Sequence, residues 1–482
     1  MGNLGIRRPP EWGVDPTPEK VRILRTFDLF VFWSSLAVGL LVFAAGTILV
    51  LLFNLTLWEV VGASLIGSVI GAVVLAGAGV FGSKFGVPTM VSLRPILGTK
   101  GSWVPSVLNV VQLVGWTSFE LYIMGLAATA LTGEFLGPQT ILFWIVVFSL
   151  VVILLAVGGP LVVIRTWLEK VAIWLVLIST VIIGFQAFQH PVDWNARYTL
   201  DAFGAVVPCG SGCSGSMLLA IDLVIAMPIS WWPLISDYNR FARSRKDAAL
   251  GTISGYTFAN FTFYFLGAAM VIATLSGNLI AAITALGLGG GVLLLILVDE
   301  SDNAFADVYS TALSVQNISK KTKQLLVIVL ATAVSVGAAF YLSSVKEPIG
   351  GGFENFLLLI GAVFVPLLGI VLADFWLVRR GNYDIGEFYG QTSNVKWRAI
   401  AAWMPGIALY YWLSPSLVRL ILPSYVGPAF SLGASVPAFL LSAMIYTMLH
   451  KVPFLATRRE VPAVDHRKPN DNATIESRLS PP

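Results

Sequence analysis

The sequence has little charge, little histidine and little cysteine. Charged residues make up only 12% of its 482 residues, and it has three His and two Cys. So few charges are unusual for a water-soluble chain of this length. With so few His and Cys, and no H-E-x-x-H motif, a zinc-type catalytic centre is not expected. A membrane-embedded hydrolase is therefore the least favoured alternative, and we predict that the protein is not an enzyme.

Apolar residues dominate instead. Hydrophobic residues reach 56%, and the mean hydropathy is +0.81. Stretches of about 20 apolar residues predict transmembrane helices in an all-α polytopic membrane protein. Twelve such stretches occur, at about 26–53, 57–81, 102–131, 139–158, 161–188, 217–237, 248–275, 291–317, 323–343, 355–377, 397–420 and 427–450.

The basic residues indicate the topology. If both termini are cytoplasmic, only Arg197, Lys346 and Arg419 of the 30 Lys and Arg fall in outer loops. The positive-inside rule favours this orientation in the plasma membrane. Because the positive charge is spread over short connections, we expect no nucleic-acid partner. The predicted organisation is a cytoplasmic tail (1–25), one transmembrane domain (26–450) and a charged, Pro-rich, disordered tail (451–482).

One predicted span carries most of the intramembrane charge. Residues 293–316 (LLLILVDESDNAFADVYSTALSVQ) include Asp299, Glu300, Asp302 and Asp307. At 100° per residue, all but Asp302 fall with Asn303 in one arc of roughly 100°, and Asp302 lies about 60° to one side. Ionisable groups at membrane depth usually mark a substrate or ion path. A structural network with basic side chains is the alternative, but almost every Lys and Arg lies in a connection or at a helix end.

Two other spans carry signs of a break. Pro228 and Pro233 predict an interruption between residues 229 and 232. The first span is rich in small residues, which favour either close packing or unwinding at its centre. These spans lie five apart in order, so spans 1–5 and 6–10 fit inverted repeats of a transporter with its site near the midplane.

The third span contains the sequence GWTSFE. Trp116 and Glu120 are spaced i, i+4 and share a helix face. A buried carboxylate beside an indole offers a hydrogen-bond acceptor next to a flat stacking surface.

Other polar groups fit structural roles. Asp374 is expected in an interfacial ion pair with Arg379 and Arg380, and a solvated helix end explains the charges around Arg165. Cys209 and Cys213 lie in a predicted outer loop, where a disulfide and free thiols are equally compatible with the sequence.

Three motifs together resemble the nucleobase:cation symporter-1 family, especially its purine, cytosine and hydroxymethylpyrimidine permease branch. They are GWTSFE, MPISWWPLISDYNR and NAFADVYSTALSVQNI. The DPTP leader and the W-x12-G run from Trp33 to Gly46 agree, so the resemblance covers about residues 15–450. It implies a leucine-transporter-like fold, with a 5+5 inverted-repeat core and two peripheral helices.

The resemblance also implies a substrate site for a small planar heterocycle such as cytosine, a purine or a hydroxymethylpyrimidine. Two tryptophans would hold the ring, one at Trp116 and the other at Trp231 or its neighbour Trp232. Acidic groups at Glu120 and Asp307 would bind its N–H edge. Gly39 and Asn303 complete the expected substrate-binding set.

The implied cation site combines helix 1 carbonyls with a pattern in helix 8. Its members are Ala37, Leu40, Val298, Ser301 and Asp302, and the adjacent Asp299 and Glu300 are further candidates. Asp302 stands where a hydroxyl is usual in sodium-coupled relatives, so the coupling ion is either H⁺ or Na⁺, with sodium the only metal considered at these residues.

The resemblance implies a secondary active importer that works by alternating access in the lipid bilayer. No cofactor and no obligate protein partner are expected. An amino-acid or amine symporter on the same fold is the alternative, and GWTSFE argues against it.

Overall fold

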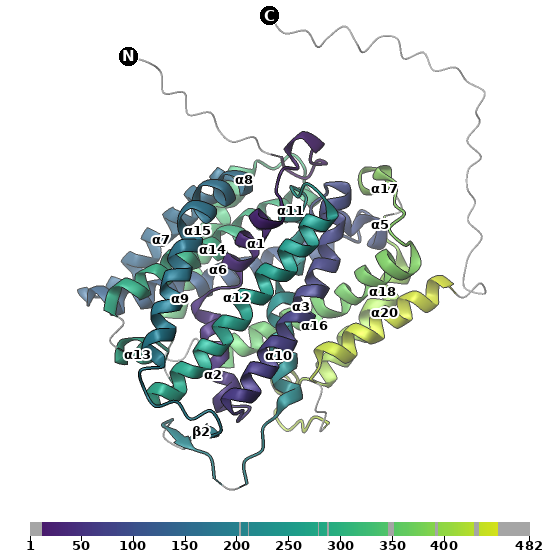
Figure 1. The fold of residues 1–482 in the computed structure, drawn as a ribbon. Helices are drawn as coiled ribbons and strands as arrows, with labels where there is room; N and C mark the ends of the chain where they lie inside the picture. The colour runs from purple at the N-terminus through teal and green to yellow at the C-terminus, as the bar shows by residue number, and fades with distance from the viewer. Residues whose placement is uncertain are drawn as a thin grey trace, which may run out of the picture.

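A computed structural model describes residues 12–451, except 202–203, 211, 278, 287–288, 346–350, 391–393 and 429–432. Inside helices, the side chains of 279–280, 284, 289–296, 298–299 and 351–354 also lie outside the described residues. The described part is an all-α bundle with three very short strands (Figure 1). This confirms the predicted fold class.

Eight helical segments in the described residues are long and apolar enough to cross a membrane. They are α3 (Leu57–Phe85), α6 (Trp103–Thr132), α7 (Thr140–Gly158), Pro160–Ala187, Met217–Asn239, α12 (Arg245–Thr274), α15 (Gln324–Ser344) and Asn355–Val378, which lies within α16 (Gly351–Leu372) and its continuation. The bent pair α1 (Thr26–Leu36) and α2 (Leu40–Leu51) forms a ninth. The remaining predicted spans correspond to the acidic α14 (Gly289–Ile318) and to the shorter α18 (Trp397–Trp412) and α20 (Ser435–Lys451).

The last two predicted helices are shorter than the sequence suggested. The helix expected over 397–420 ends at Trp412, and a separate α19 (Pro415–Arg419) follows. Pro415 explains this, because a proline disfavours helical geometry in the preceding residue yet suits the first turn of a new helix. The final helix begins at Ser435 rather than near 427.

Both spans that carry signs of a break are interrupted. The helix axis bends by 64° between α1 and α2. In the second half, α10 (Met217–Ser230) gives way to a 3-10 turn (Trp232–Leu234) and then to α11 (Ile235–Asn239). Pro233 lies in that turn and cannot donate a backbone hydrogen bond, which explains the interruption.

The fifth and tenth spans share another irregularity. The Pro160–Ala187 segment contains a π-helical stretch, Val163–Ala172, between α8 (Pro160–Val162) and α9 (Ile173–Ala187). A second π-helical stretch, Ala373–Val378, follows α16. Each half of the core thus has a broken first span and a π-helical stretch in its fifth, as inverted repeats would.

Close packing places α14 inside the bundle. It packs against α6, α7 and α15, while α12 packs against α3 and both halves of the broken first span. Glycines permit the α2–α12 contact, since a Cβ at Gly267 would lie 2.2 Å from the carbonyl oxygen of Phe43. The last two helices, α18 and α20, pack together with α16 at one side of the bundle (Figure 1).

Short helices and strands cover the two ends of the helix bundle. Figure 1 shows α13 (Leu279–Ala285) and β2 (Tyr198–Leu200) at the end opposite α5 (Arg94–Leu97) and α17 (Ile385–Tyr389). The strand β2 pairs antiparallel with β3 (Val206–Pro208). Cys209 and Cys213 form a disulfide just after β3. The remaining short elements are a 3-10 turn (Glu19–Val21), α4 (Thr89–Ser92) and β1 (Phe135–Pro138).

The N-terminal segment 12–25 is tied to the α5–α17 end. Arg240 donates from Nη1 to the carbonyl oxygen of Gly13 at 2.7 Å, and the Tyr389 hydroxyl donates to that of Val14 at 2.8 Å. The Leu24 amide donates to the carbonyl oxygen of Phe241 at 3.0 Å. These contacts join residues far apart in the chain.

Candidate functional site

The acidic helix α14 divides its polar groups between two places. Glu300, Asn303 and Asp307 line a cavity inside the bundle, as the 100° periodicity predicts for residues on one face. Asp302 instead turns toward Trp167 and Ser35. The 60° offset of Asp302 on the helix accounts for this separation.

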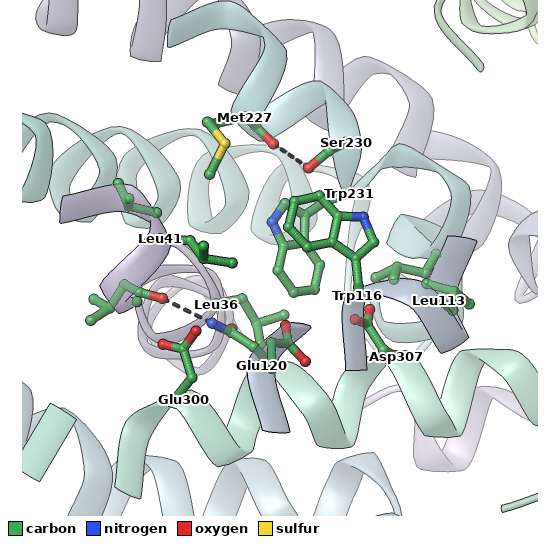
Figure 2. A pocket seen from close by; sticks show the side chains of 15 residues that line it. Leu36, Leu41, Leu113, Trp116, Glu120, Met227, Ser230, Trp231, Glu300 and Asp307 are labelled. Atoms are coloured by element: carbon green, nitrogen blue, oxygen red, sulfur yellow. Dashed lines mark hydrogen bonds between the residues drawn. The ribbon is translucent and has the colours of Figure 1, made fainter. Parts of the chain in front are cut away.

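The cavity is small in this structure, with a volume of about 30 Å³. It lies between the α1–α2 break, α6, the α10 break and α14 (Figure 2). Its lining residues are Leu36, Val38, Gly39, Leu41, Val42, Leu113, Trp116, Glu120, Met227, Ser230, Trp231, Leu234, Glu300, Asn303 and Asp307.

Two tryptophans, one from each half of the chain, lie on the cavity wall. Trp116 comes from α6 and Trp231 from the break after α10, and Figure 2 shows both indoles among the cavity side chains. Trp232 is not among the residues that line this cavity. Its indole N–H donates to the carbonyl oxygen of Phe364 at 3.1 Å, because the turn directs this next residue toward α16.

The break between α1 and α2 is bound by α14. Glu300 accepts a hydrogen bond at Oε2 from the Leu40 amide at 3.1 Å, and Asn303 donates from Nδ2 to the carbonyl oxygen of Val38 at 2.9 Å. These contacts satisfy backbone groups that the interrupted helix leaves free. Gly39 lies between them, and a Cβ there would approach Glu300 Oε2 to 2.8 Å.

The three cavity carboxylates have few partners. Glu120, Glu300 and Asp307 are 3%, 1% and 2% exposed. Within the described residues, Glu120 Oε2 has no hydrogen-bond partner, and Asp307 makes neither a hydrogen bond nor an ion pair. None of the lining residues is Lys, Arg or His. The cavity therefore presents negative or acceptor groups without an internal cation.

Asp302 forms a separate polar centre. It is completely buried, and it accepts hydrogen bonds at Oδ1 from the indole N–H of Trp167 at 2.6 Å and at Oδ2 from the Ser35 hydroxyl at 3.0 Å. Charge-assisted hydrogen bonds of this kind hold a carboxylate in a fixed orientation.

The other expected cation-site residues are less closely grouped. The Ser301 hydroxyl donates to the carbonyl oxygen of Leu297 in its own helix at 3.2 Å. Ala37 and Leu40 lie at the α1–α2 break, where the Leu40 amide is bound by Glu300. The side chains of Val298 and Asp299 lie outside the described residues.

Sequence reasoning missed Trp167 and Ser35. Trp167 belongs to the π-helical stretch that the neighbouring charges had marked as a solvated end, and Arg165 does contact Asp28 there at 3.4 Å. No local pattern pairs Trp167 with Asp302, because 135 residues separate them. An apolar ring beside interface charges usually indicates only an anchor at the membrane surface.

A second buried acid lies where the tenth span ends. Asp374 Oδ2 is 3.7 Å from Arg379 Nε and accepts from the Tyr383 hydroxyl at 2.5 Å, while Oδ1 accepts from the Tyr446 hydroxyl at 2.8 Å. Burial by itself would lower the pKa of Arg379, but Asp374 and Glu387 raise it. The expected ion pair is confirmed with Arg379, whereas Arg380 is exposed.

Comparison with known sequences gives a consistent group of similar proteins. The family described as "Permease for cytosine/purines, uracil, thiamine, allantoin" matches residues 16–434. The hydantoin permease of Microbacterium maritypicum is 23% identical over 424 residues, covering 84% of each chain. The cytosine permease of Escherichia coli K12 is 27% identical over 370 residues, covering 74% of this chain and 78% of the relative.

Comparison with solved structures identifies the same fold. Mhp1, a nucleobase-cation-symport-1 family transporter in a closed conformation with bromovinylhydantoin bound, aligns with a TM-score of 0.73 at 19% identity. The alignment covers 92% of this chain and 94% of that one. The bundle with two broken spans is therefore the fold of a known transporter.

Proposed function

This chain belongs to the nucleobase:cation symporter-1 family, whose members are permeases for cytosine/purines, uracil, thiamine and allantoin, and from that membership we propose how its cavity works. The protein is a multi-pass membrane permease for a nucleobase or related heterocycle, coupled to a cation. One observation carries the proposal for the site: two indoles and three carboxylates line a single cavity beside two helix breaks.

Each part of the cavity has a proposed task. Trp116 and Trp231 hold the faces of the ring, since aromatic faces bind any planar heterocycle by stacking. Glu120 and Asp307 accept hydrogen bonds from its N–H groups. Asn303 adds a further acceptor, because its Oδ1 has no partner among the described residues. Gly39 lets the ligand approach the helix break closely.

The two broken spans supply the moving part. Alternating access in inverted-repeat transporters comes from a bundle rocking against a scaffold around a site at the repeat interface. Here α1–α2 and α10–α11 form the bundle, and α6 and α14 belong to the scaffold. Glu300 and Asn303 link the two, because they bind the backbone of the α1–α2 break. Ligand contacts with α14 can therefore bias the position of the broken helix.

Asp302 is the proposed coupling group. It is buried, and its partners Ser35 and Trp167 come from the first and fifth spans, so a change in its charge would alter contacts of both. A proton on Asp302 and a sodium ion held by its oxygens with Ser301 and the Ala37 carbonyl are the two forms of coupling. No cofactor, catalytic residue or obligate protein partner enters the proposal.

The orientation follows from the basic residues. We place the protein in the plasma membrane with both termini in the cytoplasm, because Lys and Arg concentrate on that side. The α5–α17 end then faces inward, and the β2–β3 hairpin with its disulfide faces outward, where disulfides persist. Residues 1–25 and 451–482 are the proposed cytoplasmic tails.

Uptake into proteoliposomes tests this function. The purified protein is reconstituted, radiolabelled cytosine is supplied, and proton and sodium gradients are imposed separately with unlabelled bases as competitors. We expect saturable accumulation under one gradient. Accumulation driven only by protons and lost in Asp302→Asn identifies a proton carrier, whereas accumulation that requires sodium identifies an ion ligand. If neither gradient drives uptake and no heterocycle competes, the proposal is wrong.

A further inference from the structure

The cavity wall has no Lys, Arg or His, and two of its polar donors are already bound. The Ser230 hydroxyl donates to the carbonyl oxygen of Met227 at 2.7 Å, and Asn303 Nδ2 is bound to Val38. In contrast, Glu120 Oε2 and Asn303 Oδ1 are buried acceptors without a partner among the described residues. A ligand that offers donors can therefore bind these acceptors, and three carboxylates lie on the same wall.

The cations of the bundle are engaged elsewhere. The ion pairs within the described residues join Arg165 to Asp28, Arg197 to Glu59, Lys320 to Asp15, and Arg379 to Asp374 and Glu387. None of these arginines and lysines lines the cavity. A buried anion is costly unless a positive charge and hydrogen bonds compensate for it. A neutral base offers only N–H groups, whereas a cationic base also compensates for each of these carboxylates that is ionised.

The arrangement of the acids suits an extended cation better than a compact ion. No three His, Cys, Asp or Glu side chains in the described part of the chain converge closely enough to hold a metal ion. Glu120, Glu300 and Asp307 are spread along the wall, and the indoles of Trp116 and Trp231 add the faces to which cations are attracted.

We propose that the transported substrate is a planar nitrogen heterocycle that carries a positive charge when bound, with its ring beside Trp116 and Trp231 and its charge near Glu120 and Asp307. This rests on the proposed function and specifies its substrate class. The charge comes either from a proton on a ring nitrogen or from a quaternary ring nitrogen. Inward movement of such a substrate is electrogenic, and a membrane potential of 100 mV favours its accumulation roughly 50-fold without any further ion.

Three probes of nearly equal shape test the charge. At pH 8, 4-aminopyrimidine is neutral, 4-aminopyridine is largely protonated, and 4-amino-1-methylpyridinium is permanently charged. Their binding to the purified full-length protein is measured by displacement of one another and by calorimetry. We expect both charged probes to bind at least tenfold more tightly than the neutral probe. If only the protonated probe does so, the charge must come with a ring N–H donor; if the quaternary probe does so equally, charge alone suffices.

Matched variants locate the effect. Glu120→Gln should reduce the preference for charged probes about tenfold, whereas Glu134→Gln, the same change at an exposed position beyond the end of α6, should leave it unchanged. The comparison of probes on the unmodified protein stands even if Glu120→Gln fails to fold. Equal or tighter binding of the neutral probe overturns the inference while leaving the proposed function intact. Failure of the folded protein to bind any planar heterocycle, charged or neutral, overturns both.

Discussion

Two groups of buried acids in this molecule differ in what surrounds them. Asp374 has an arginine and two tyrosine hydroxyls from its own chain, and its negative charge is compensated. Glu120 and Asp307 are equally buried, yet no cation of the chain reaches them. A carboxylate that the fold has already paired holds helices together. A carboxylate left unpaired in a cavity stays available to a ligand. Its burial lowers the stability of the fold, which favours a binding role over a structural one.

The largest expected effect comes from unpairing Asp374. Arg379→Met leaves a buried charge without its partner, which typically costs about 3–5 kcal/mol of folding free energy. Thermal and SDS unfolding of the detergent-purified protein should register this loss. Arg380→Met, at the exposed neighbour, is the control and should change little. Equal stability of the two variants would mean that Asp374 does not need its cation.

For an acid of the cavity, we expect the opposite effect on stability. Asp307→Asn removes a buried carboxyl group that the described residues leave without a partner, so stability should stay the same or increase. Loss of a charged hydrogen bond to substrate, about 2–3 kcal/mol, should weaken apparent substrate affinity roughly 30-fold to 150-fold. Uptake kinetics and melting temperature are measured on the same preparation. A fall in both stability and affinity would place Asp307 among the structural acids.

The adjacent Trp231 and Trp232 differ in a similar way, because Trp231 lines the cavity and Trp232 binds Phe364 of α16. Trp231→Ala removes a stacking face from the cavity, and a loss of about 1–2 kcal/mol should weaken binding roughly fivefold to 30-fold. Trp232→Phe removes the hydrogen bond to Phe364 and part of a buried side chain, and should reduce stability by about 1–3 kcal/mol with affinity unchanged. Binding and unfolding measurements on both variants separate the two roles, and reversed effects would exchange the assignments.

The smallest effect is expected at Gly39. In Gly39→Ala the new methyl group would meet Glu300 Oε2 at 2.8 Å, so Glu300 must shift from the Leu40 amide. Overpacking of this size costs about 1 kcal/mol, equivalent to roughly fivefold weaker substrate binding. Gly133→Ala, where the Cβ would meet open space but φ is also positive at +71°, is the control for backbone strain without a clash. Unchanged binding in Gly39→Ala would show that Glu300 can move freely.

Local patterns predicted the helices and much of the cavity. Helical periodicity separated Asp302 from Glu300 and Asp307, and the prolines marked the second break correctly. The i, i+4 spacing in GWTSFE correctly suggested that Trp116 and Glu120 face the same way. These features depend only on residues within one or two turns of helix.

Contacts between spans that are far apart in the sequence could not be predicted from such local patterns. The choice between Trp231 and Trp232 depends on how the 3-10 turn is oriented against α16, and Trp167 meets Asp302 only because the fifth span packs beside α14. Likewise, the sequence pattern makes Glu300 a candidate for the cation site, and no local signal indicates that it lines the cavity and binds the Leu40 amide across the helix break.

The contacts of the N-terminal segment have a consequence for synthesis of the protein. The carbonyl oxygen of Val14 binds Tyr389, which is synthesised 375 residues later. That of Gly13 binds Arg240, which is synthesised 227 residues later. At about 5–20 residues per second, translation takes roughly 20–75 s to make the partner of Val14. Thr17 has its partner much earlier, because its amide donates to the carbonyl oxygen of Gly86 at 2.8 Å. The N-terminal segment can therefore be attached in stages, with the contact of Val14 among the last to form.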